Sequence, residues 1–112
     1  DSISMSVSFA RVQAAARRIA PYVRRTPLIR VEGLSDATGR DVFLKLETLQ
    51  RTRSFKRRGA CNALLALAER QSPLPPLVTA SAGNHGVALS SIARELGARL
   101  TIYVPKDAPR AK

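Results

Sequence analysis

The sequence predicts an α/β fold in which short strands alternate with helices. Three short apolar segments, 41–47, 77–80 and 99–104, are separated by two stretches with helical periodicity, 54–70 and 84–97. Strand–helix alternation with short connections is typical of a parallel sheet covered by helices. We therefore expect these five elements to form one parallel α/β unit.

A helix and an extended segment are expected before this unit. Apolar side chains recur every three or four residues within 9–23, and Ser8 can cap the N-terminus of this helix. Pro21 should end or kink the helix. Residues 25–31 should be extended, because Pro27 disfavours helical angles at the residue before it.

Glycines and prolines indicate where further elements end. Residues 34–40 are expected to form a short helix or turn closed by Gly39, and Gly97 should cap the helix at 84–97. Three prolines within 72–76 require the helix that starts near residue 54 to stop before them.

The composition limits the function classes. The 112 residues suffice for one domain, and the net charge of +11 invites a nucleic-acid interpretation. However, arginines are spread along the whole chain and only 4% of residues are aromatic, so the interleaved basic and stacking residues of single-strand binders are missing. A basic protein whose residues 51–58 contact nucleic-acid phosphates stays as an alternative, but a nucleic-acid partner is not favoured.

The single cysteine, Cys61, excludes an internal disulfide and favours a reducing, cytoplasmic location. The apolar run 63–68 is far shorter than the roughly 20 residues that cross a bilayer, so no membrane partner is expected. Residues 1–7 are expected to be a tag remnant or a disordered N-terminus. No metal site is expected.

The stretch "RTRSFKRRGA" contains five basic side chains in eight positions, and Lys56 is the candidate nucleophile among them. Ser54 is placed to cap the following helix, which puts Lys56 in the first turn. The positive end of the helix and the charges of Arg53, Arg57 and Arg58 disfavour an ammonium there. A neutral lysine amine is the usual nucleophile toward a carbonyl. The alternative is a solvated basic helix start.

The stretch "TASAGNHG" joins a strand to a helix through a turn of small and polar residues. Such a turn aims backbone N–H groups at an anion. Gly83 and Gly86 permit close approach and unusual backbone angles, while Ser81 and Asn84 supply polar groups. His85 by itself is more typical of a turn residue than of an acid–base catalyst.

Four segments together resemble the pyridoxal-phosphate enzymes of fold type II, and most closely the threonine/serine dehydratases (ammonia-lyases). These segments are "RTPL" at 25–28, "LKLETLQRTRSFKRRGA" at 44–60, "ASAGNHG" at 80–86 and "VPKDAPRAK" at 104–112. The resemblance implies that residues 8–112 are the N-terminal segment of a catalytic fold, about the first third of the expected enzyme. The fold is then incomplete without downstream sequence.

The resemblance also implies roles for individual residues. Lys56 would be the lysine that bonds to pyridoxal 5'-phosphate as a Schiff base and then moves protons. Phe55 would lie against the cofactor ring, and Asn84 would hydrogen-bond the ring oxygen. The loop that receives the substrate carboxylate, largely through backbone N–H groups, would consist of Ser81, Gly83, Asn84 and His85.

The implied activity is α,β-elimination of threonine or serine to a 2-oxo acid and ammonia by the parent enzyme, a homo-oligomer acting on a small amino acid. Alternatives are another fold type II reaction, β-replacement or racemization. Phe55, Arg57 and His85 favour the dehydratase branch over the sulfhydrylases and threonine synthases. Ala82 stands where serine racemases have a catalytic serine, which disfavours racemization.

Two positions depart from the family. Arg53 replaces a glycine, which costs on the order of 1 kcal/mol if this position needs positive φ. Arg57 replaces a residue that is more often apolar. The family's phosphate-binding glycine run has no counterpart among the six glycines, and neither does the group that faces the pyridine nitrogen. We therefore expect these 112 residues alone not to be a competent enzyme.

Overall fold

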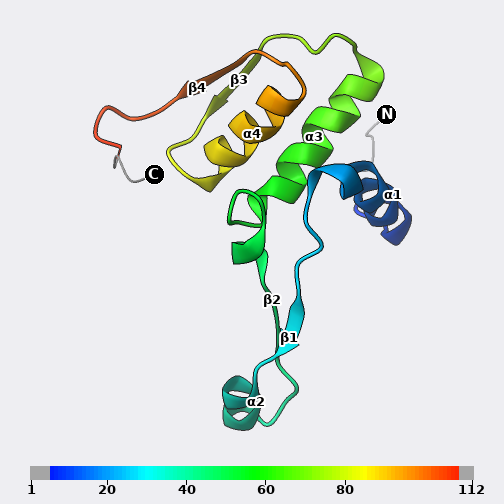
Figure 1. Cartoon of the computed structure of the whole chain (residues 1–112), viewed down its shortest axis with the longest axis vertical. Coiled ribbons are helices and arrows are strands. Elements are labelled where there is room, and N and C mark those ends of the chain that lie inside the picture. Colours follow the sequence, from blue (N-terminus) through cyan, green and yellow to red (C-terminus); the bar gives the residue numbers. More distant parts are fainter. Residues whose placement is uncertain (1–5, 109–112) are drawn as a thin grey trace.

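The structure, a computed structural model, describes residues 6–108 (Figure 1). Residues 1–5 of the expected N-terminal remnant and residues 109–112 of the last motif lie outside this range. The elements are α1 (Phe9–Ile19), the 3-10 helix η1 (Ala20–Tyr22), β1 (Leu28–Arg30), α2 (Glu32–Thr38), β2 (Phe43–Lys45), the 3-10 helix η2 (Glu47–Leu49), α3 (Lys56–Arg70), β3 (Leu77–Ala80), α4 (Asn84–Glu95) and β4 (Leu100–Tyr103).

The body of the molecule contains the expected parallel pair. Strands β3 and β4 pair in parallel from Leu77 with Leu100 to Ala80 with Tyr103, and α4 connects them. This is the strand–helix–strand unit that the sequence predicts, and the α/β fold class is confirmed.

The prediction that segment 41–47 joins this parallel sheet is wrong. Strand β2 pairs antiparallel with β1, from Leu28 with Lys45 to Arg30 with Phe43, in a separate two-stranded sheet. Strands that are neighbours in sequence usually pair with each other, and β1 and β2 follow this rule. The segment β1–α2–β2, residues 28–45, projects from the body as an arm (Figure 1).

The predicted N-cap at Ser8 and the predicted helix ends at Gly39 and Gly97 are confirmed. Ser8 Oγ accepts a hydrogen bond from the Arg11 N–H at 3.3 Å, and the chain continues from α1 into a 3-10 turn that contains Pro21. Gly39 and Gly97 follow α2 and α4 with φ of 65° and 66°. Glycine adopts this left-handed conformation without steric cost, so both positions suit a helix end.

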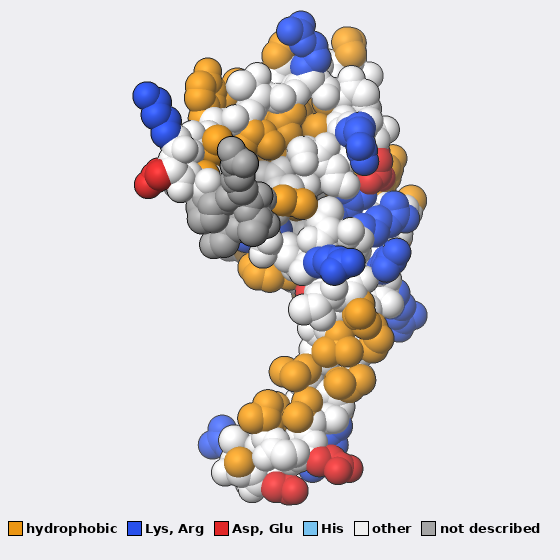
Figure 2. Space-filling model, turned by 60° about the vertical axis from the view of Figure 1, so that its left-hand side comes forward, with side chains coloured by type: hydrophobic (Ala, Val, Ile, Leu, Met, Phe, Trp, Pro, Cys, Tyr) orange, Lys and Arg blue, Asp and Glu red, His pale blue; other side chains and the backbone are white. Residues whose placement is uncertain are grey.

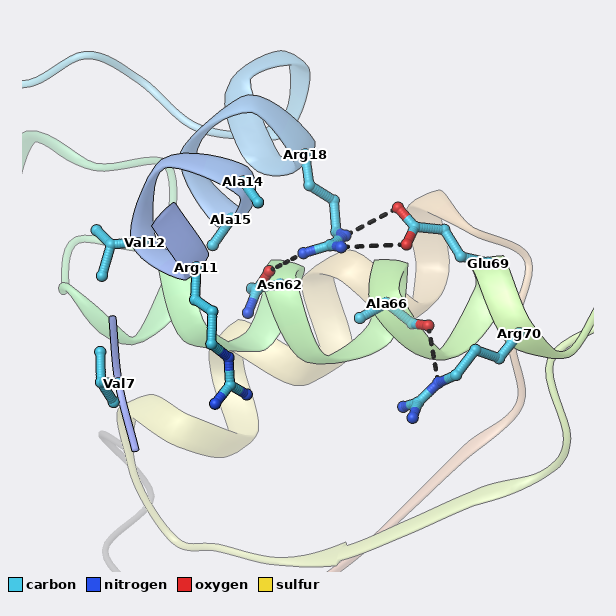
Figure 3. A pocket seen from close by; sticks show the side chains of 10 residues that line it. All are labelled: Val7, Arg11, Val12, Ala14, Ala15, Arg18, Asn62, Ala66, Glu69 and Arg70. Carbon is cyan, nitrogen blue, oxygen red and sulfur yellow. Dashed lines mark hydrogen bonds and ion pairs between the residues drawn. The ribbon is translucent and has the colours of Figure 1, made fainter. Parts of the chain in front are cut away.

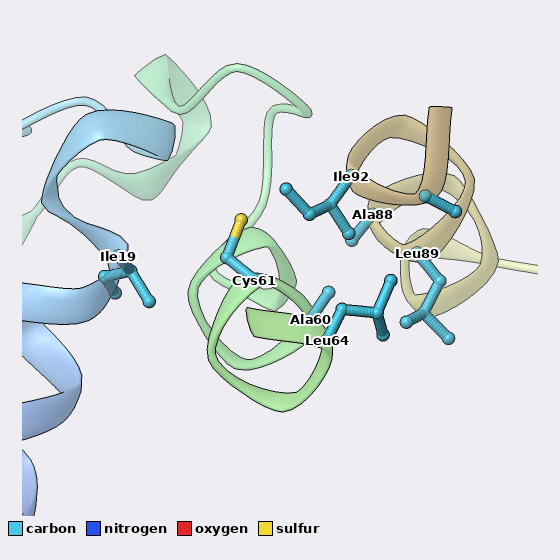
Figure 4. Close-up of a cluster of buried hydrophobic side chains, with 8 residues drawn as sticks. Ile19, Ala60, Cys61, Leu64, Ala88, Leu89 and Ile92 are labelled. Atoms are coloured by element: carbon cyan, nitrogen blue, oxygen red, sulfur yellow. The ribbon is translucent and has the colours of Figure 1, made fainter. Parts of the chain in front are cut away.

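The hydrophobic core lies around α3, which is sandwiched between α1 and α4 (Figure 4). Its buried side chains are Ile19, Ala60, Cys61, Leu64, Ala88, Leu89, Ile92 and Ala93. Alanines at the contact between α3 and α4 let the two helices approach closely. Burial raises the pKa of the Cys61 thiol. The core therefore fixes α4 against α3.

Much apolar surface is left exposed outside this core. Leu28 and Phe43 of the arm are 63% and 52% exposed, and hydrophobic side chains follow the length of the arm (Figure 2). Val78 and Tyr103, on the sheet, are 69% and 65% exposed. The radius of gyration is 17.0 Å, against about 13 Å for a compact domain of this length.

Within residues 6–108, none of the helices combines the length and apolar character needed to cross a membrane.

Candidate active site around Lys56

Lys56 is the first residue of α3, and its side chain is exposed. Its Nζ lies 5.3 Å from the centroid of the Phe55 ring, which is itself largely exposed. An amine and an aromatic ring therefore lie next to each other on an accessible surface, where a flat ligand could bond to the one and contact the other.

The prediction that Ser54 caps α3 is wrong. The residue before the helix is Phe55, in a helical conformation, and no described side chain caps the first turn. Ser54 is only 8% exposed, and its Oγ has no hydrogen-bond partner among the described residues. The Oγ1 of Thr52 is buried and unpartnered in the same way. The hydroxyl of Ser54 is buried away from the free N–H groups that it was expected to cap.

Arg53 has a positive φ of 59°. In this left-handed region the Cβ of an L-residue crowds its own backbone, and glycine avoids the crowding. The sequence predicts that arginine is strained here if the position needs a positive φ. The observed φ meets this condition.

The charges of Arg57 and Arg58 were expected to repel the Lys56 ammonium, but both are paired with carboxylates. Arg57 is fully buried, with Nη2 2.6 Å from Glu95 Oε1. Arg58 donates to both carboxylate oxygens of Glu47, at 2.8 and 3.0 Å. The two guanidinium groups therefore connect the first turn of α3 to α4 and to η2.

Glu47, in η2, is the centre of a network that joins the chain on both sides of the arm to α3. It accepts hydrogen bonds from Arg58 and from the hydroxyl of Thr26, and Arg58 also donates to the carbonyl of Arg24. The pKa of Glu47 is lowered, chiefly by the Arg58 hydrogen bond and also by the Thr26 hydroxyl, while burial acts in the opposite direction. The carboxylate is therefore charged in the folded protein at neutral pH.

The loop 81–86 is organised by Ser81. Its Oγ accepts hydrogen bonds from the N–H groups of Gly83 and Gly86, at 3.2 and 3.0 Å. A Cβ on Gly86 would lie 3.3 Å from the Cβ and Oγ of Ser81, so this close approach favours glycine. Among the described residues, the N–H groups of Asn84 and His85 have no acceptor, and both side chains are exposed. Both N–H groups could donate to an anion, as the sequence predicts for this turn.

The first turns of α3 and α4 lie toward the same end of the helix pair. Figure 1 shows the two helices side by side and running in the same direction. Lys56 begins one helix, and the loop 81–86 leads into the other. The structure thus brings the two predicted halves of the site to one end of the body.

Two pockets lie elsewhere on the body. One of about 550 Å³ lies between α1 and α3, where Arg18 contacts Glu69 at 2.8 and 3.1 Å and Asn62 at 2.8 Å (Figure 3). Another of about 650 Å³ is lined by α1, α3 and Lys45 of the arm. Neither pocket is lined by Lys56 or by the loop 81–86. Lys56, Asn84 and His85 are all exposed, so the candidate site is an open surface within the described residues.

Sequence reasoning missed the partners of Arg57, namely Glu95, Ser91 and the Tyr22 carbonyl. A signal was present, because position 57 has helical spacing with the buried residues Ala60 and Leu64. That spacing places Arg57 on the buried face of α3. Its burial, and the pairing of Arg58, disfavour a phosphate-contacting role for 51–58.

The residues present fit the lysine side of pyridoxal phosphate, which needs an accessible amine, a flat apolar contact and donors for an anion. The family pattern described as pyridoxal-phosphate dependent enzyme matches residues 19–112. The chain is 46% identical over 101 residues to a serine racemase of Arabidopsis thaliana, covering 90% of this chain and 30% of the relative. It is 44% identical over 107 residues to a catabolic L-threonine dehydratase of Staphylococcus aureus, covering 95% and 31%.

The solved structures agree. The crystal structure of a pyridoxal 5'-phosphate-dependent aspartate racemase superposes with a TM-score of 0.86 at 37% identity, over 96% of this chain and 34% of that one. The chain belongs to the pyridoxal-phosphate dependent enzymes, and its fold matches the N-terminal portion of the fold type II group. Its cofactor is pyridoxal 5'-phosphate. The chain spans about a third of the length of these relatives.

Proposed function

We propose that the protein carrying this chain catalyses α,β-elimination of threonine or serine, giving a 2-oxo acid and ammonia. The observation that carries the proposal is the placement of the exposed Lys56 amine, beside the Phe55 ring, at the same end of the helix pair as the loop 81–86. Residues 8–112 are then the N-terminal segment of the catalytic fold. A small amino acid is the substrate, and a homo-oligomer is the expected assembly.

Each site residue has a role in this proposal. The cofactor, when bound, supplies an aldehyde for the lysine amine and a ring that withdraws electrons from the substrate Cα. Lys56 would hold the cofactor through its side-chain amine, and the same amine would serve as the base for the Cα proton. The Phe55 ring would contact the cofactor, and the Asn84 amide would donate to its ring oxygen. The free N–H groups of Asn84 and His85 orient the substrate carboxylate.

Elimination is favoured over racemization by Ala82, which stands where the resemblance places the catalytic serine of serine racemases. Racemization needs a second group that moves a proton on the other side of the substrate, and the methyl group of Ala82 cannot do this. The neighbouring hydroxyl of Ser81 is engaged by two backbone N–H groups of its own loop. Racemization stays the second candidate, because the relatives include proteins named serine racemase and aspartate racemase.

The cofactor bond is tested first. Borohydride reduction of the cofactor-loaded protein, followed by peptide mapping, should place the label on Lys56. Lys56→Arg should abolish this label, whereas Lys106→Arg, at an exposed lysine far along the chain, should leave it unchanged. A label on any other lysine of the unaltered protein contradicts the assignment.

The reaction is tested separately. The protein should release 2-oxo acid from L-threonine or L-serine and form D-serine more slowly, as followed by chiral chromatography. D-serine formation that outpaces 2-oxo acid release would favour the racemase candidate instead. Label on Lys56 with neither product would leave β-replacement as the reaction of this site.

A further inference from the structure

Arg57, the residue after Lys56, makes an unusually complete set of contacts for a buried charge. Its side chain is 0% exposed. Nε and Nη2 donate to the carbonyl oxygen of Tyr22 at 3.1 and 2.9 Å, Nη1 donates to Ser91 Oγ at 3.0 Å, and Nη2 donates to Glu95 Oε1 at 2.6 Å. These acceptors belong to η1 and α4, so one side chain of α3 is bonded to two other elements.

The first turn of α3 needs such an anchor. It has no side-chain cap, and the hydroxyl of Ser54, which could have supplied one, is buried without a partner. Helix ends without a cap fray readily. The lateral bonds of Arg57 supply the restraint that a cap would have given.

The same bonds connect the two halves of the candidate site. Lys56 and Arg57 share the first turn of α3, while Ser91 and Glu95 lie on the helix that the loop 81–86 leads into. We propose that Arg57 is a positioning residue that fixes the Lys56 amine relative to the loop 81–86. The inference rests on the proposed function, since it concerns how that site is held together.

The planar fork of arginine matters here as well as its charge. A lysine at position 57 has a single ammonium, which cannot reach Tyr22, Ser91 and Glu95 in the same geometry. An apolar side chain fills the space but leaves the Tyr22 carbonyl without both of its guanidinium donors. Both Arg57→Lys and Arg57→Met should therefore loosen the first turn of α3.

Hydrogen exchange detected by mass spectrometry tests the anchor without the cofactor. In Arg57→Met, the amides of 60–63, whose helical acceptors are the carbonyls of 56–59, should exchange about tenfold faster relative to those of 64–70. Arg57→Lys should also accelerate the exchange of these amides, and it replaces Arg57→Met in the test if that variant does not fold. Arg94→Met, which makes the same change at an exposed arginine of α4, should exchange as the unaltered protein does. Uniformly faster exchange along α3 would show a purely structural role and overturn the inference.

The distribution of cofactor label among the four lysines provides the second readout. After incubation with pyridoxal phosphate and reduction, the share of label on Lys56, against Lys45, Lys106 and Lys112, should fall several-fold in both Arg57 variants and not in Arg94→Met. An unchanged share, with Lys56 labelled in the unaltered protein, overturns the positioning role while the proposed function stands. If Lys56 is not labelled in the unaltered protein, the proposed function fails, and the exchange measurement still decides on the anchor.

Discussion

The carboxylate of Glu47 accepts hydrogen bonds from two nitrogens of Arg58, at 2.8 and 3.0 Å, and this pair joins η2, just after the arm, to the helix that begins with Lys56. The Glu47 side chain is only 14% exposed and that of Arg58 is 33% exposed. A pair in this setting is less screened by solvent than a surface ion pair. We expect it to contribute measurably to stability.

Glu47→Gln should lower the free energy of unfolding by roughly 1–3 kcal/mol, because one charge-assisted partner of Arg58 is lost. Urea denaturation followed by circular dichroism measures this. Glu69→Gln, which breaks the exposed pair with Arg18, should cost less and lose its effect at high salt. Equal losses in the two variants would contradict a special role for the buried pair.

The pH dependence of this contribution has a definite sign. The pKa of Glu47 is lower in the folded protein than in the unfolded chain, because the Arg58 hydrogen bond favours the carboxylate. Its contribution to stability is therefore complete above the unfolded pKa, about 4.3, and is lost as the pH falls through the folded pKa. The stability difference between the unaltered protein and Glu47→Gln should shrink on acidification over this range.

Arg53→Gly should stabilise the protein by about 1 kcal/mol, because φ at this position is 59° and glycine adopts it without strain. Thermal or urea unfolding measures the change. Arg17→Gly, which places glycine inside α1, should instead destabilise by about 0.5–1 kcal/mol. A loss of stability in Arg53→Gly would mean that the arginine side chain makes a compensating contact.

Local features of the fold could be predicted from the sequence because their causes are local. The cap at Ser8, the interruption at Pro21 and the glycine at position 39 each act within a few residues of chain. The parallel pair β3–β4 was also predictable, since two short apolar segments flank one helix. Lys56 begins the helix before β3, and the loop 81–86 follows β3. This arrangement along the chain favours the prediction that the two belong to one site.

The remaining features depend on contacts between distant parts of the chain. Strand β2 takes its partner from β1, and the hydroxyl of Ser54 is buried although its sequence position suits a cap. Arg57 reads as surface charge in a basic run, yet its partners on α4 lie 34 and 38 residues away. The pattern of residues near one position in the sequence does not indicate which distant residue will contact it.

Ser81→Ala should destabilise the protein by about 1–2 kcal/mol, because the N–H groups of Gly83 and Gly86 lose their acceptor at the start of α4. Ser90→Ala, at an exposed serine of the same helix, should change stability by less than about 0.5 kcal/mol. Chemical denaturation of both variants makes the comparison. Indistinguishable midpoints would show that water replaces the Ser81 hydroxyl at no cost.

Ala82→Ser should raise the rate of D-serine formation relative to 2-oxo acid release, because it places a hydroxyl in the loop that the substrate carboxylate is proposed to contact. The lysine side of the site is unchanged by this substitution, so elimination should continue. Both products can be measured in one incubation with L-serine, which makes their ratio independent of enzyme concentration. Ala82→Val, which adds bulk without a proton carrier, separates the chemistry of the hydroxyl from its size. A ratio that rises equally in both variants would mean that the size of the side chain at position 82 changes the ratio. The second proton carrier of the reaction would then lie elsewhere.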